Sequence, residues 1–199
     1  QIKNYLINED LENAVNFPLQ DSSELKGISP FLGLADNLGV IHRNISEGPI
    51  RSVEINCYGT LDQIKPISLS FLRSLLQNRV PERVNFINAE TIAKELGIDL
   101  SINYSTSDSN YSNLISANVI SKNDIIFEGS VFNDNLPRLV NLMGYKMEVN
   151  LKGTLLFIQN DDVPGVVGKV GTILGKNKIN IGAYLLSQHS KEKLAFAVI

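Results

Sequence analysis

The stretch NDDVPGVVGKVG, residues 160–171, followed by INIG at residues 179–182, decides the fold of the C-terminal part of this 199-residue chain. The residues just before it are almost all apolar, which is typical of a central strand. Pro164 suits the first turn of a helix because it needs no hydrogen-bond donor there. Gly165 lets a ligand approach the backbone closely. The order predicted is a strand over 154–159, a helix over 165–177, a strand over 179–186 and a last strand from residue 194.

The helix start in this stretch has features of a site for a small amino acid. Its free N–H groups and the positive end of the helix dipole would suit a carboxylate or a phosphate. Asp162 would take up an ammonium group, and Asn180, expected at the start of the next strand, would contribute an amide. From the residues alone, an ordinary strand–turn–helix with packing glycines is the favoured interpretation. They match neither G-x-G-x-x-G nor G-x-x-x-x-G-K-[ST], the nucleotide-binding fingerprints.

The rest of the chain predicts helices first and a run of strands later, which is the layout of an α+β protein rather than of alternating βαβ units. Leu19 to Gly27 has no periodicity and is interpreted as a linker, and residues 150–153 are interpreted as a boundary. Helices are predicted from Ser29 to Ile45, over 66–77 and from Asn88 to Leu96, and alternating strands at 53–57, 98–104, 115–119, 125–131 and 145–149, with a further possible strand over 136–142.

Composition excludes several classes of protein. The net charge is −3 and no block of Lys and Arg occurs, which argues against a nucleic-acid partner, since phosphate binding needs clustered positive charge. No apolar run approaches the ~18 residues of a membrane span, and no signal peptide is visible at Gln1. A single cysteine, Cys57, allows no internal disulfide, has no metal-ligand spacing around it, and favours a reducing compartment such as the cytoplasm.

Several segments resemble D-3-phosphoglycerate dehydrogenases in collinear order. Residues 160–182 resemble the ACT regulatory domain of these enzymes. FINA at 86–89 with AKELGI at 93–98, YSNLI at 111–115, and GSVF at 129–132 with PRLV at 137–140 are similar to their intervening, allosteric substrate-binding domain. NAVNFP at 13–18 resembles the end of their catalytic portion.

The resemblance implies three parts. Residues 1–27 would be the end of the catalytic portion with a linker, residues 28–150 an intervening α/β domain with an antiparallel sheet, and residues 151–199 a ferredoxin-like ACT domain of βαββ order, incomplete at its C-terminus. The final strand of an ACT domain pairs with its first strand. Without that partner the strand over 154–159 is expected to be an exposed edge, which is an aggregation liability.

The resemblance also implies a function. The parent enzymes use NAD to oxidise 3-phosphoglycerate in the first step of L-serine biosynthesis, and L-serine inhibits them from an ACT site at a subunit interface. The chain has no counterpart of their catalytic residues or NAD-binding fold, so we expect it to be inactive alone, to bind no cofactor, and to self-associate through its ACT and intervening domains. The serine site implied consists of Asn160, Asp162, Val163, Pro164, Gly165, Val166 and Asn180, with Asn180 supplied by a partner subunit.

Two other functions remain open from the residues. One is a standalone ACT-type module that binds amino acids or forms dimers. The other is part of an iron–sulfur L-serine dehydratase, which also carries an intervening-type domain, although the chain contains no cluster of cysteines.

Overall fold

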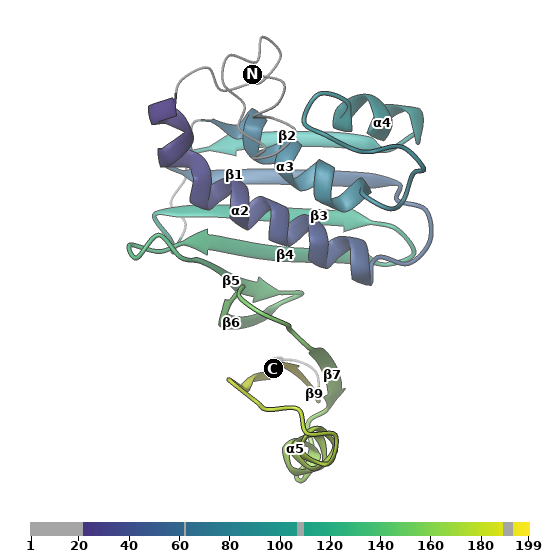
Figure 1. Cartoon of the computed structure of the whole chain (residues 1–199), viewed down its shortest axis with the longest axis vertical. Helices are drawn as coiled ribbons and strands as arrows, with labels where there is room; N and C mark the ends of the chain where they lie inside the picture. The colour runs from purple at the N-terminus through teal and green to yellow at the C-terminus, as the bar shows by residue number, and fades with distance from the viewer. Residues whose placement is uncertain (1–21, 62, 107–109, 189–192) are drawn as a thin grey trace.

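The computed structural model describes residues 22–61, 63–106, 110–188 and 193–199, which build two β-sheets one beyond the other along the long axis (Figure 1). The segment 13–18, which resembles the end of a catalytic portion, lies outside the described residues. The first sheet has six strands in the order β2-β1-β3-β4-β5-β6, and the second has three in the order β7-β9-β8. The predicted α+β class is therefore confirmed.

The elements of the first sheet follow the predicted order closely. The helices are α2 (Ser22–Ile45), α3 (Ile64–Leu76) and α4 (Ala89–Glu95). The strands are β1 (Ser52–Gly59), β2 (Asp99–Ser105), β3 (Asn113–Ile120), β4 (Asp124–Val131), β5 (Pro137–Leu142) and β6 (Tyr145–Asn150).

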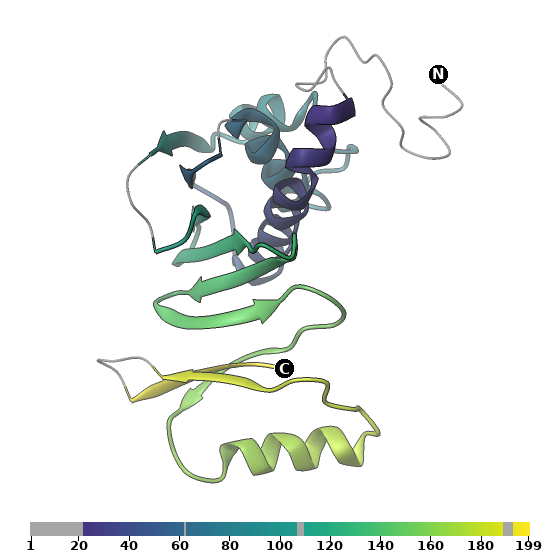
Figure 2. The ribbon, with the colours of Figure 1, turned by 90° about the vertical axis from the view of Figure 1, so that its left-hand side faces the viewer.

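One face of the first sheet carries the main core. Val53, Ile55 and Cys57 alternate with more exposed residues along β1 and are fully buried, as the period of two predicts. Helices α2 and α3 cover this face (Figure 2), and Leu38 and Phe71 in their apolar stripes have no exposed surface. Burial raises the pKa of the Cys57 thiol to about 12, so this cysteine is a core residue and not a nucleophile.

Two expectations for the first sheet were wrong. The sheet is mixed, because β1 and β2 pair in parallel while the other pairs are antiparallel. A parallel pair needs a long crossover, and α3 and α4 form it. Helix α2 begins at Ser22 rather than near Ser29, and Pro30 lies inside it. Burial of the stripe that follows Pro30 outweighs the loss of one helical hydrogen bond.

The second sheet is built from β7 (Phe157–Asp161), β8 (Leu185–Gln188) and β9 (Leu194–Val198), with α5 (Val166–Lys176) between β7 and β8. The β-α-β-β order and the antiparallel pairing of β9 with both neighbours agree with the ferredoxin-like expectation. Strand β7 has one partner, β9, among the described residues and lies at an edge, as expected. Helix α5 lies on the side of this sheet away from the first sheet (Figure 2).

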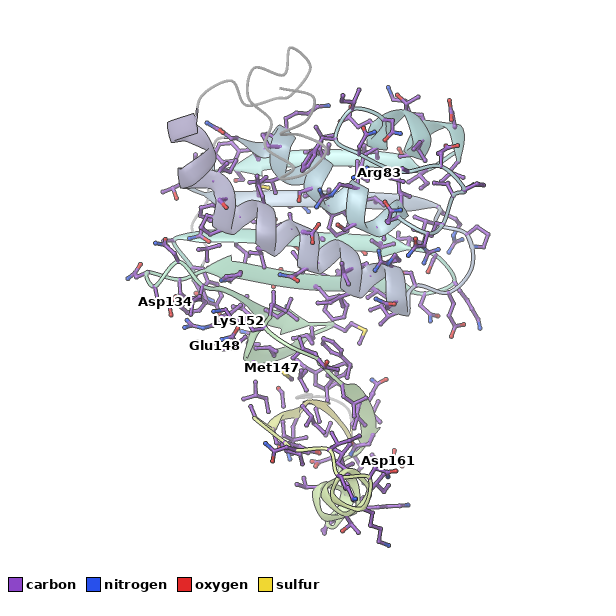
Figure 3. All side chains as sticks on the ribbon, viewed as in Figure 1. Arg83, Asp134, Met147, Glu148, Lys152 and Asp161 are labelled. Carbon is purple, nitrogen blue, oxygen red and sulfur yellow. The ribbon has the colours of Figure 1, made fainter. Side chains whose placement is uncertain are left out.

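The two sheets meet through aromatic side chains. Tyr145 on β6 and Phe196 on β9 have ring centroids 5.3 Å apart, and both are nearly fully buried. Phe157 on β7 contacts Phe196 edge-to-face at 6.3 Å. Figure 3 shows Met147 of β6 on the side of the first sheet that faces the second. The second sheet therefore shares part of its core with the first.

The helices of the described residues are all too short or too polar to cross a membrane.

Candidate functional site

The turn between β7 and α5 contains most of the residues implied in serine binding. Val163, Pro164 and Gly165 are exposed and Val166 is half-buried. The Val163 N–H donates to the Asp161 carbonyl at 2.9 Å, which closes a tight turn. Gly165 has φ of 94°, in the left-handed region, where glycine carries no Cβ penalty. This backbone requirement is a reason for glycine at 165 that does not depend on a ligand.

The first turn of α5 leaves its N–H groups available. Gly165 is the N-cap residue and no side chain caps the helix, and the first turn contains no acidic residue. The first N–H groups of any helix lack intrahelical acceptors, and the helix dipole adds partial positive charge there. An anionic group would be stabilised at this end of α5.

Asp162 lies immediately before this turn with its carboxylate exposed. Its backbone N–H donates to the Lys193 carbonyl at 3.0 Å, which fixes the residue beside the start of β9. Its Oδ2 accepts a hydrogen bond from Nε2 of Gln188 at 2.7 Å. The carboxylate forms no ion pair with any residue in the described part of the chain, so its charge is available to a cation.

The two polar atoms of the Asn160 side chain differ in their hydrogen bonding. It is half-buried on β7, and its Nδ2 donates to the Asp161 carbonyl at 2.6 Å. Its Oδ1 is buried and has no hydrogen-bond partner among the described residues. A buried carbonyl oxygen without a donor is unfavourable, so Asn160 carries an unused hydrogen-bond acceptor among the described residues.

Asn180 does not lie where the sequence placed it. Strand β8 begins at Leu185, and Asn180 lies in the exposed segment between α5 and β8. The structure gives it no hydrogen bond to Asn160 or to Asp162. The apolar run over 179–186 therefore indicated a longer strand than the hydrogen bonds with β9 support.

Two polar residues near these groups escaped the sequence analysis. Gln188 holds the Asp162 carboxylate, and Tyr184 has a buried hydroxyl without a partner among the described residues. Neither belongs to the turn motif. Tyr184 directly precedes β8 and Gln188 ends it, so no local sequence pattern marked either residue.

Figure 3 shows Asp161 at the end of the second sheet that lies away from the first sheet and next to α5. The candidate site thus lies at the far end of the molecule, while the Tyr145–Phe196 contact joins the same sheet to β6 on its other face.

Comparison with known proteins identifies the larger part of the chain. The family model of the D-3-phosphoglycerate dehydrogenase intervening domain matches residues 27–143. The D-3-phosphoglycerate dehydrogenase of Bacillus subtilis is 31% identical over 182 residues, which is 90% of this chain and 35% of that protein.

Two archaeal relatives agree. The D-3-phosphoglycerate dehydrogenase of Methanocaldococcus jannaschii is 33% identical over 92% of this chain and 35% of its own length, and that of Archaeoglobus fulgidus is 28% identical over 89% and 34%. The chain spans about a third of the length of these relatives, in their C-terminal part. The chain belongs to the D-3-phosphoglycerate dehydrogenase intervening-domain family.

Proposed function

We propose that the chain is the regulatory portion of an NAD-dependent D-3-phosphoglycerate dehydrogenase and senses L-serine for feedback inhibition. In this proposal residues 28–150 are the intervening domain and residues 151–199 belong to an ACT domain. The NAD-binding and catalytic domains belong to the parent enzyme, which is cytoplasmic and catalyses the first step of L-serine biosynthesis. The chain alone is inactive, and it self-associates through both of its domains.

The serine proposal rests on one observation: an exposed carboxylate and the N-terminal end of a helix, which attract opposite charges, lie within one short turn. The carboxylate of Asp162 has no ion pair among the described residues, and it lies three residues before Gly165, the N-cap of the uncapped helix α5. An α-amino acid carries an ammonium group and a carboxylate on one carbon. Asp162 attracts the ammonium group, and the N–H groups that follow Gly165 attract the carboxylate.

The buried Oδ1 of Asn160 adds a third contact. It accepts a hydrogen bond from the ligand hydroxyl, which distinguishes L-serine from L-alanine. Asn180 contributes from a partner subunit, which agrees with its exposure in a single chain.

Isothermal titration calorimetry with L-serine on the 199-residue chain tests the proposal. We expect Asp162→Ala to weaken binding roughly tenfold or more, the cost of a lost charge-assisted hydrogen bond. The control is Asp161→Ala, which removes the same charge from the neighbouring residue and leaves the affinity within about twofold, since the side chains alternate between faces at this end of β7. Undiminished serine binding by Asp162→Ala would contradict the role of Asp162 in the site. Absence of serine binding by the unaltered chain would contradict serine sensing itself.

A further inference from the structure

Gln188 and Asp162 form a bridge across the second sheet. Gln188 lies on β8 and Asp162 follows β7, and these are the two edge strands on either side of β9. The Gln188 Nε2 nevertheless donates to Asp162 Oδ2 at 2.7 Å. The two backbones are two strand spacings apart, about 10 Å, so both side chains must reach over the central strand.

Ala195 lies on the central strand between the two strands that the bridge joins. Strand register pairs Ala195 with Gln188 on one side and with Asn160 on the other. Side chains paired directly across strands lie on the same face of a sheet, so these three residues form one row on that face. Ala195 is 1% exposed, and Asp162 follows Asn160 by two residues, so the bridge runs from one end of this row to just beyond its other end.

The bridge fixes a carboxylate that would otherwise rotate freely in solvent. Asp162 is exposed and has no ion pair among the described residues, so the Gln188 bond is what restrains its side chain. This bond uses Oδ2 and leaves Oδ1 without a hydrogen-bond partner among the described residues. A carboxylate whose rotamer is already fixed loses less conformational entropy when it binds a ligand than one that rotates freely.

We propose that Gln188 is the positioning residue for the ammonium-binding carboxylate of Asp162. The inference rests on the proposed function and names a residue outside the turn motif. Gln188 acts through Asp162, because its amide neutralises no charge and its hydrogen bond goes to that carboxylate.

A double-mutant cycle on L-serine affinity tests this role. The variants are Gln188→Met, Asp162→Ala and the double variant, each titrated calorimetrically as the full chain. We expect Gln188→Met to weaken binding roughly five- to tenfold, the effect of one ordinary hydrogen bond, because the variant keeps the Asp162 charge. Because Gln188 acts through Asp162, the double variant should bind no more weakly than Asp162→Ala alone.

The matched control is Gln159→Met. It makes the same chemical change on β7 of the same sheet, but the Gln159 amide points to the other face and contacts the Tyr145 hydroxyl at 3.4 Å. Serine affinity should stay within about twofold in this variant, since it leaves the bridge intact.

The outcomes separate the two proposals. Normal serine binding by Gln188→Met, multiplicative losses in the double variant, or an equal loss in Gln159→Met would each overturn the role of Gln188 and leave serine sensing standing. An unaltered chain that binds no L-serine would overturn serine sensing and the role of Gln188 together.

Discussion

Tyr145 and Phe196 lie 5.3 Å apart between ring centroids and tie the last strand of the first sheet to the central strand of the second. Phe196 pairs in register with Gln159, one residue before Asn160. A contact between sheets thus lies on the opposite face of the strands that carry the candidate site. A change in the site that shifts β7 or β9 would also displace β6 through this contact, because close-packed side chains transmit displacement.

Truncating this contact should be costly. We expect Phe196→Ala to lower the free energy of unfolding by about 3–5 kcal/mol, the usual range for a buried aromatic side chain. Tyr145→Phe keeps the ring and removes the hydroxyl, which Gln159 contacts at 3.4 Å, so it should cost less than the loss of the Phe196 ring. Urea unfolding followed by circular dichroism compares the two, and equal losses would contradict a contact made by the rings.

Close packing of α2 on α3 depends on Gly39. A Cβ at this position would lie 2.5 Å from the Phe71 backbone oxygen, which cannot move without shifting α3. Gly39→Ala should therefore destabilise the chain by about 1–3 kcal/mol.

Gly33 in the same helix provides the control for Gly39. A Cβ there meets nothing within 4 Å, so Gly33→Ala should stabilise the chain by up to about 1 kcal/mol through helix propensity. Thermal unfolding of the two variants should move in opposite directions, and a shift of the same sign in both would refute the packing argument.

The turn before α5 should show a similar contrast. Gly165 has positive φ, and alanine there costs about 1–2 kcal/mol in backbone strain. Gly168 lies inside α5 with open space around it, so Gly168→Ala should gain up to about 1 kcal/mol. Hydrogen exchange of the α5 amides measures both effects locally, with faster exchange expected in the Gly165 variant and slower exchange in the Gly168 variant.

His42 should make stability depend on pH. The ring is fully buried between Phe71 and Phe127, and its Nε2 donates to the Ala117 carbonyl at 3.2 Å. Burial lowers its pKa from 6.5 to about 4. Between these pH values the unfolded chain binds the proton and the folded chain does not, so stability falls as pH falls, by up to about 3 kcal/mol for this group.

A neutral variant isolates the contribution of His42. Both chains should lose stability between pH 6.5 and pH 4, but the free energy of unfolding of His42→Gln should fall less, by up to about 3 kcal/mol, than that of the unaltered chain. Urea unfolding at half-unit pH intervals measures it, and identical pH profiles for both chains would show that His42 does not carry the effect.

Local pattern was a good guide to most elements. The alternation along β1 correctly gave the buried face of Val53, Ile55 and Cys57. The helix predicted over 165–177 is α5 at Val166–Lys176, although Pro164 lies before its N-cap rather than in its first turn. These features depend on residues close together in sequence, where side-chain period and backbone preference decide the outcome. The same reasoning failed at Pro30 and at Asn180, where packing and strand pairing decided the bounds instead.

For the candidate site, the sequence by itself determined the turn, the carboxylate at 162 and the glycine at 165, because one short segment contains them all. Only the tertiary structure decided the parallel pairing of β1 with β2, the orphaned oxygen of Asn160 and the bridge from Gln188 to Asp162. Gln188 is 26 residues from Asp162 along the chain. It reaches that carboxylate only because β9 inserts between β7 and β8, and strand order follows from hydrogen bonds and burial over the whole sheet rather than from any local period.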